Sequence, residues 1–224
     1  MAQYNLGAMF NEGQGVPQDH AEAAKWLRKA AEQGDVRAQY NIGLMFQKGK
    51  GVPQDYTEAM KWYRKAAEQG YARAQYNLGL MFHKGQGVPR DYAEAAKWSR
   101  KAAEQGDARA QYNLGVMFHI GDGVPRDYAE GAKWIRMAAE QGISEAQSTL
   151  ALMYANGRGV PKDYVQSYFW YSLATSGASA DEYEQPSEAR DRAAGLLNPE
   201  KLMEAQRMVR EWKKSHPLPY TRKN

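Results

Sequence analysis

The sequence predicts an all-α protein, a solenoid built from repeated helical hairpins. The tripeptide Gly-Val-Pro recurs at a constant step of 36 residues, beginning at Gly15, Gly51, Gly87, Gly123 and Gly159. Tryptophan keeps the same step, at Trp26, Trp62, Trp98, Trp134 and Trp170. A fixed period of about 20–50 residues is typical of solenoids, in which one unit cannot bury its own apolar face. No segment shows the alternating pattern that predicts a strand.

The second unit shows the expected elements in order. Apolar residues at helical spacing predict a first helix over residues 38–48. Its buried face is expected to consist of Ala38, Ile42, Met45 and Phe46. Gly49 and Gly51 should end this helix, because glycine adopts left-handed backbone angles at low cost.

The second helix of the unit is expected to start at an aspartate. Asp55 is the predicted N-cap, and Glu58, three residues later, would complete a capping box. The same pair recurs as Asp19/Glu22, Asp91/Glu94 and Asp127/Glu130, and as Asp163/Gln166. Because the apolar stripe continues until Gly70, the second helix is expected to be the longer one.

The pattern changes after Trp170. A polar loop with the sequence GASADEYEQPS is expected, then helices over 187–197 and from Pro199 to about Trp212. The predicted organisation is five repeats (1–36, 37–72, 73–108, 109–144 and 145–177), a C-terminal capping hairpin (178–215) and a flexible tail (216–224). A more polar hairpin at the end would shield the last apolar face.

Composition excludes several classes of protein. The chain has no cysteine, which excludes disulfides and thiolate metal sites, and no apolar run long enough to span a membrane. The net charge of +4 is mild, and basic and acidic residues are interleaved throughout. No signal peptide is evident. Met1 stands where later repeats have Arg37, Arg73 and Arg109, so we expect the array to extend upstream, which leaves localisation undecided.

The repeat unit AQYNLGLMFHKGQGVPRDYAEAAKWSRKAAEQG resembles the Sel1-like repeat, a relative of the tetratricopeptide repeat. The shared marks are Leu-Gly in the first helix, the Gly-x-Gly-Val-Pro-x-Asp-Tyr loop, Lys-Trp in the second helix and the closing Ala-Ala-Glu-Gln-Gly. The resemblance covers residues 2 to about 177. It implies a right-handed superhelix that binds proteins and assembles complexes, in bacterial roles from envelope maintenance to host contact.

Motifs that suggest catalysis have simpler explanations here. A phosphate-binding loop needs a preceding strand, whereas Gly-x-Gly-Val-Pro lies between two predicted helices and before an aspartate. The repeated Asp and Glu pairs have capping geometry, and no Ser-x-x-Lys motif supports a hydrolase acting on cell wall or β-lactams. His83 and His119 occupy equivalent positions, but a third histidine is missing, so we expect no metal and no cofactor.

RNA binding is the alternative from another functional class. Helical repeats can read RNA one base per repeat, and Arg37, Arg73 and Arg109 recur in register. Against this, the first unit is net negative, so the sequence shows no continuous basic stripe.

The predicted function is therefore a scaffold that binds a segment of another protein, with no catalysis. The face of the first helices opposite the buried one is the candidate surface. The residues we expect to contact the partner are Tyr40, Tyr76, Tyr112, Gln47, His83, His119, Lys48 and Lys84. Positions 11, 47, 83 and 119 read Asn, Gln, His and His in repeats whose framework is nearly identical, which suggests that the fold does not fix them. The tyrosine rings could instead pack between neighbouring first helices. The open apolar face of the first unit also allows end-to-end self-association.

Overall fold

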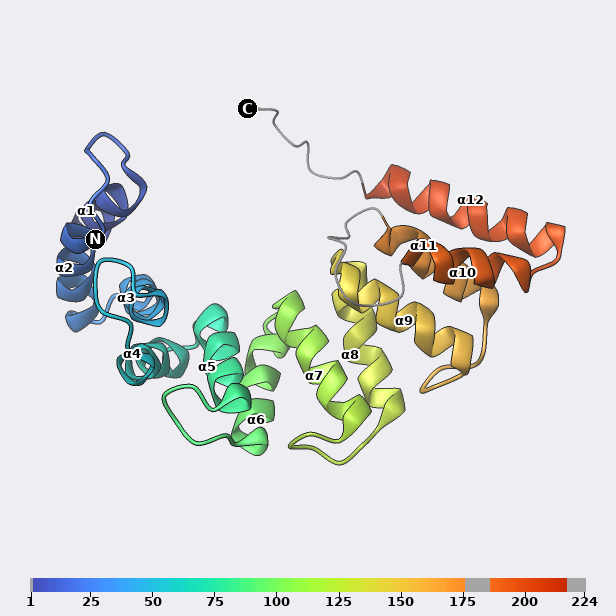
Figure 1. The fold of residues 1–224 in the computed structure, drawn as a ribbon, viewed down its shortest axis with the longest axis horizontal. Helices are drawn as coiled ribbons and strands as arrows, with labels where there is room; N and C mark the ends of the chain where they lie inside the picture. The colour runs from blue at the N-terminus through green and yellow to red at the C-terminus, as the bar shows by residue number, and fades with distance from the viewer. Residues whose placement is uncertain (1, 176–185, 217–224) are drawn as a thin grey trace. The chain divides into compact units, whose positions relative to one another are not determined.

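The computed structural model describes residues 2–175 and 186–216, and within these ranges all regular structure is α-helical (Figure 1). The helices are α1 (Ala2–Glu12), α2 (His20–Glu32), α3 (Val36–Lys48), α4 (Tyr56–Glu68), α5 (Ala72–Lys84), α6 (Tyr92–Glu104), α7 (Ala108–Ile120), α8 (Tyr128–Glu140), α9 (Ser144–Asn156), α10 (Tyr164–Ala174), α11 (Pro186–Gly195) and α12 (Pro199–Ser215). The predicted all-α class is confirmed. The centre of the predicted polar loop and nearly all of the predicted tail lie outside the described residues.

The chain divides into two compact units. Unit 1 comprises residues 1–110 with 122–124, and unit 2 comprises residues 111–121 with 125–224. In unit 1, α1 packs on α2, α3 on α4 and α5 on α6, and α2 and α4 also pack on α3 and α5, respectively. In unit 2, α8 packs on α9, and α10 packs on α9, α11 and α12. Within each unit, stacked hairpins of this kind bury the apolar face of one hairpin against the next hairpin.

The first helices start earlier than predicted. The buried face of α3 consists of the expected Ala38, Ile42, Met45 and Phe46, but the helix begins at Val36. Asp35 explains the difference, because its carboxylate accepts hydrogen bonds from the backbone N–H groups of Arg37 and Ala38. As a result α3 and α4 each have 13 residues, and the prediction of a longer second helix was wrong.

The capping boxes are only half formed. Asp55 caps α4 as predicted and accepts from Thr57 and Glu58 N–H groups at 2.8 and 3.0 Å. Its own N–H donates to the carbonyl of Phe46 at 3.0 Å, and the Glu58 carboxylate accepts from Lys61 instead. The predicted return bond from Glu58 was therefore wrong, because the antiparallel partner helix supplies the acceptor.

The second glycine of the Gly-x-Gly-Val-Pro loop contacts the preceding repeat. Gly51 has φ +69, and a Cβ built there would overlap the His20 carbonyl of α2 and lie 2.9 Å from the Ala21 nitrogen. Gly87 repeats the arrangement, with its Cβ position 2.5 Å from the Tyr56 carbonyl oxygen. This glycine therefore serves both the turn and the junction between repeats.

A buried glutamine in α3 links three helices through hydrogen bonds. Gln39 is 4% exposed; its amide donates to the Ala31 carbonyl of the preceding second helix at 3.1 Å. Its carbonyl oxygen accepts from Gln69, at the end of its own second helix, at 2.7 Å. Both bonds recur at Gln75, with Ala67 and Gln105, whereas Gln111 repeats the bond from the terminal glutamine, Gln141, and Gln147 repeats the bond to a preceding carbonyl, that of Ala139. We call this set the glutamine relay; it satisfies buried polar groups that would otherwise be costly.

The last helices cover the apolar side of α10. Met208, Val209 and Trp212 of α12 pack against a buried cluster that includes Phe169 and Trp170. The Trp212 ring meets each of these two aromatic rings edge-on, with centroids 5.8 Å apart. This contact buries the apolar side of α12. Apolar residues at helical spacing within 202–212 predict such a side. No helix in the described ranges is both long and apolar enough to cross a membrane.

Candidate functional site

The side of α3 and α5 that points away from the core forms the candidate surface. We define the first-helix face by its residues Arg37, Tyr40, Asn41, Leu44 and Lys48 of α3, and Arg73, Tyr76, Asn77, Leu80 and Lys84 of α5. All of them are half-buried or exposed, whereas the opposite sides of both helices are buried. Both helices belong to unit 1.

The tyrosines of the first helices bond across to the next repeat. The Asn41 amide donates to the Tyr4 hydroxyl at 3.5 Å, and Tyr40 is hydrogen-bonded to Asn77 in the same way. In unit 2 the Tyr112 hydroxyl lies 3.4 Å from the Thr149 hydroxyl. Their rings are half-buried, so these tyrosines hold neighbouring first helices together and expose only an edge.

Repeat 2 carries a cluster of tyrosines around Tyr63. Tyr63 is fully buried, its ring centroid lies 5.7 Å from that of Tyr40, and its hydroxyl donates to the Gln47 side chain at 2.8 Å. Tyr40 also meets Tyr71 edge-on at 5.3 Å. Burial raises the pKa of the Tyr63 phenol far above its usual value, so it remains a neutral hydrogen-bond donor. Tyr63 thus brings two predicted site residues, Tyr40 and Gln47, into one cluster.

His83 lies at the end of α5, beside the loop of the next repeat. Its Nε2 atom is 3.9 Å from the Asp122 carboxylate, and its ring meets Tyr92 edge-on at 5.3 Å. Its side chain remains 44% exposed, so an interaction with a partner is sterically open.

His119 belongs to unit 2 and has a different environment. Its ring meets Tyr128 edge-on at 4.9 Å, and its Nδ1 atom is buried without a hydrogen-bond partner. Burial, followed by the positive charges of Arg158 and Arg126, lowers the pKa of the His119 imidazole below its usual value. The equivalent histidines His83 and His119 therefore lie near opposite charges. The residue between the two loop glycines of the following repeat is Asp122 near His83 and Arg158 near His119.

Lys48 and Lys84 end α3 and α5 and are exposed. Within the described part of the chain neither makes an ion pair, and a cation at a helix C-terminus suits the helix dipole. Their ammonium groups are thus available to a partner. The predicted site residues Tyr40, Gln47, Lys48, Tyr76, His83 and Lys84 all lie in unit 1, whereas Tyr112 and His119 lie in unit 2.

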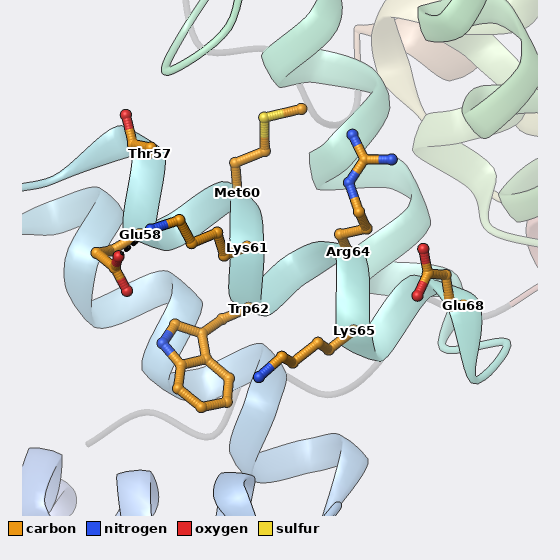
Figure 2. A pocket seen from close by; sticks show the side chains of 8 residues that line it. All are labelled: Thr57, Glu58, Met60, Lys61, Trp62, Arg64, Lys65 and Glu68. Atoms are coloured by element: carbon orange, nitrogen blue, oxygen red, sulfur yellow. Dashed lines mark hydrogen bonds and ion pairs between the residues drawn. The ribbon is translucent and has the colours of Figure 1, made fainter.

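A shallow depression of about 360 Å³ lies on α4, away from the first-helix face (Figure 2). Its lining residues all come from α4, and both of its lysines are engaged with other lining residues. Lys61 pairs with Glu58 at 2.5 Å, and the Lys65 ammonium lies 4.4 Å from the centre of the Trp62 ring. Figure 2 shows Trp62 and Lys65 on one side of the helix and Met60 and Arg64 on the other. Since one helix supplies every wall, no polar groups converge here on a substrate.

The carboxylates that sequence spacing could assign to catalysis act as helix caps. Asp19, Asp55, Asp91, Asp127 and Asp163 each accept backbone N–H bonds at the start of a second helix. Among the described residues no group of three or more histidines and carboxylates could hold a metal ion.

Sequence reasoning missed Asn41 and Asn77 as members of this surface. Asparagine has low helix propensity, so its repetition in the middle of α3 and α5 was the available signal. Both amides bond to the tyrosine of the preceding repeat and line the exposed stripe between the arginine and the leucine.

Comparison with protein families gives a match over most of the chain. The model of the Sel1 repeat matches residues 1–35, 36–71, 72–107, 108–143 and 144–179. Comparison with curated protein sequences gives no match.

Solved structures of bacterial proteins resemble the chain. One is c5321 of uropathogenic Escherichia coli, described as a protective antigen displaying an SLR fold, with 39% identity and a TM-score of 0.81. That match covers 96% of this chain but only 46% of c5321. A Sel1 repeat protein from Oxalobacter formigenes is 35% identical with a TM-score of 0.76, covering 94% of this chain and 86% of that protein. The immunity protein Pa5087 of Pseudomonas aeruginosa, at 19% identity and a TM-score of 0.52, shares the fold; the match covers 97% of this chain and 88% of that one.

Proposed function

Because this chain belongs to the Sel1 repeat family, we propose that it is a non-catalytic scaffold that binds a segment of a partner protein on its first-helix face. Sel1 repeat proteins are generally scaffolds for protein interactions. The observation that supports this proposal is a contrast between two parts of each repeat. The framework repeats nearly unchanged, whereas residues 47 and 83 at the ends of the first helices differ, and Lys48 and Lys84 beside them form no ion pair among the described residues.

The contacts of the first-helix face support different roles for its residues. Leu44, Leu80, Lys48 and Lys84 would touch the partner directly, since their exposed groups have no other structural task. Tyr40 and Tyr76 would mainly fix the spacing of the first helices, and Gln47 and His83 would tune the surface beside the loops. Tyr112 and His119 would have the corresponding roles within unit 2. A surface of this kind fits an extended or helical segment of another protein.

Selection of peptides from a random displayed library tests the proposal and requires no candidate partner. Recovered peptides would be labelled, and their dissociation constants measured by fluorescence anisotropy. The double variant Leu44→Asp with Leu80→Asp should abolish binding. The matched variant Thr57→Asp with Ala93→Asp, at exposed positions of α4 and α6, should bind as the original chain does. Circular dichroism would confirm that both variants are folded. Recovery of no peptide, or equal loss in both variants, would contradict the proposal.

Two alternatives are outcomes of the same experiment. RNA binding would appear as tight binding of an oligoribonucleotide that Leu44→Asp with Leu80→Asp weakens while no peptide binds. A hydrolase of cell-wall or β-lactam type would require turnover of such a substrate, and the contacts of the capping aspartates do not favour that assignment.

Self-association through the first repeat is a further proposed interaction. Met9 of α1 is 37% exposed, whereas the equivalent Met45 and Met81 are 5% and 0% exposed because a preceding second helix covers them. An uncovered apolar face of this kind favours association. Sedimentation velocity over a concentration series should show a dimer that Met9→Lys weakens; a concentration-independent monomer would contradict this interaction.

A further inference from the structure

The lysines of the second helices are engaged within the protein. Lys25, Lys61, Lys97 and Lys133 pair with a glutamate three residues earlier, at 2.5–3.0 Å. Lys29, Lys65 and Lys101 lie over the tryptophan three residues earlier, 4.4–4.6 Å from the ring centre. Each of these second-helix lysines therefore has a carboxylate or an aromatic ring as a near neighbour that stabilises its positive charge.

The first-helix face has the opposite character. Lys48 and Lys84 form no ion pair or ring contact among the described residues, and Arg73 forms no ion pair there. Arg37 stacks over the Tyr4 ring at 4.3 Å and lies 3.7 Å from Asp35, yet its side chain is 47% exposed. Stacking leaves the edge of a guanidinium free to bind a carboxylate. Four cations thus lie on a face whose own residues include no acidic side chain.

These cations occur in a defined arrangement. Arg37 and Lys48 are separated by eleven residues of one helix, which corresponds to about 16 Å at 1.5 Å per residue. Arg73 and Lys84 repeat the pair on α5, which the Tyr40–Asn77 hydrogen bond joins to α3. Leu44 and Leu80 lie between the two ends. Arg109 repeats the arginine on α7, but the complete arginine–lysine pair is confined to α3 and α5, because the residues equivalent to Lys48 are Glu12 on α1 and Ile120 on α7.

We propose that the partner segment is acidic, with carboxylates about five extended residues apart on either side of an apolar residue. At roughly 3.3 Å per residue, five residues span the separation of the arginine and lysine ends. The apolar residue would lie on Leu44 and Leu80. This inference rests on the proposed function and specifies the chemistry of its partner.

RNA fits the same cations less well. Recognition of single strands depends on aromatic rings that are free to stack with bases. Here Arg37 covers the Tyr4 ring, and Tyr40 packs against both Tyr63 and Tyr71. The face therefore offers positive charge beside aliphatic side chains, which suits an acidic peptide.

Three labelled probes test the inference on the full chain: a peptide with two Asp-Glu pairs flanking a central leucine, the same peptide with Asn-Gln pairs, and a polyuridine oligoribonucleotide. The acidic peptide should bind most tightly, and its affinity should fall as salt rises. Lys48→Gln with Lys84→Gln should weaken binding between about twofold and thirtyfold, the range for two exposed ion pairs. Lys61→Gln with Lys97→Gln makes the same change of charge on the second helices and should leave the affinity unchanged.

The outcomes separate this inference from the proposed function. Equal binding of the acidic and neutral peptides, equal weakening by both double variants, or preference for the oligoribonucleotide would each overturn the acidic partner. Library peptides without acidic residues that still require Leu44 and Leu80 would overturn it while supporting the proposed scaffold. Failure to recover any peptide would remove both.

Discussion

Replacing Gly51 by alanine should destabilise unit 1 more than the same replacement at Gly49, two residues earlier in the same loop. Both glycines have left-handed backbone angles, φ +69 and +66. At Gly49 a Cβ would lie 3.3 Å from the Gln54 Cβ, close to an ordinary contact. At Gly51 it would overlap the carbonyl of His20, which is backbone of the preceding repeat and cannot rotate away.

The size of the difference follows from these two environments. Left-handed angles cost an alanine about 1–2 kcal/mol at either position. Only Gly51→Ala must also push its loop away from the backbone at the start of α2, and overpacking of this kind costs about 1–3 kcal/mol more. With a urea dependence of roughly 2 kcal/mol per molar, the midpoint should fall about 0.5–1.5 M below that of Gly49→Ala.

Urea unfolding followed by circular dichroism measures both midpoints. Gly87→Ala with Gly85→Ala provides an independent pair, since the Tyr56 carbonyl is 2.5 Å from the Cβ position at Gly87 and the nearest atom at Gly85 is 3.4 Å away. Equal midpoints within each pair would refute the reasoning, because turn geometry alone would then explain both glycines.

Other contacts give further expectations. Gly79→Leu should lower the free energy of unfolding by about 1–3 kcal/mol, because a Cβ there lies 2.8 Å from the Ser99 hydroxyl, while Gly195→Leu, with no atom within 4 Å, should be nearly neutral; urea unfolding compares them. Tyr63→Phe should cost about 0.5–1.5 kcal/mol through loss of its bond to Gln47, and an unchanged midpoint would count against that bond. The lowered pKa of His119 means that its neutral form stabilises the fold above the usual value of 6.5, and this contribution is lost as pH falls below it. The melting temperature should therefore drop less on acidification in His119→Gln, and parallel drops would exclude His119 as the cause.

The period of the sequence predicted the helices well because each hairpin is a local pattern. The buried face of α3 and the aspartate caps of the second helices follow from spacing within one unit. Asp35 was overlooked as a cap because it belongs to the end of the preceding repeat. Glu58 was assigned a return bond because the sequence does not show that the Phe46 carbonyl already occupies the Asp55 N–H.

Contacts between repeats were harder to anticipate. Gly51 meets His20 about thirty residues earlier, and a single unit gives no sign of that approach. Spacing placed Tyr40 on the exposed side of α3, but its ring packs on Tyr63 and Tyr71. The residue equivalent to Tyr71 is Asp35, Asp107 or Ile143 in the other repeats, so the general repeat pattern does not predict this cluster. The sequence placed Lys48 and Lys84 on the candidate surface, but it could not show that the second-helix lysines are paired while these two are not.

The glutamine relay has a consequence for how such chains change in length. The junctions at Gln39 and Gln75 use the same amide, backbone carbonyl and terminal glutamine, so nothing in them identifies which hairpin comes before or after. Recombination that removed or duplicated one 36-residue unit would recreate an equivalent junction. Genes for these proteins could therefore gain and lose hairpins without a new interface having to evolve, and selection could act on the exposed positions alone.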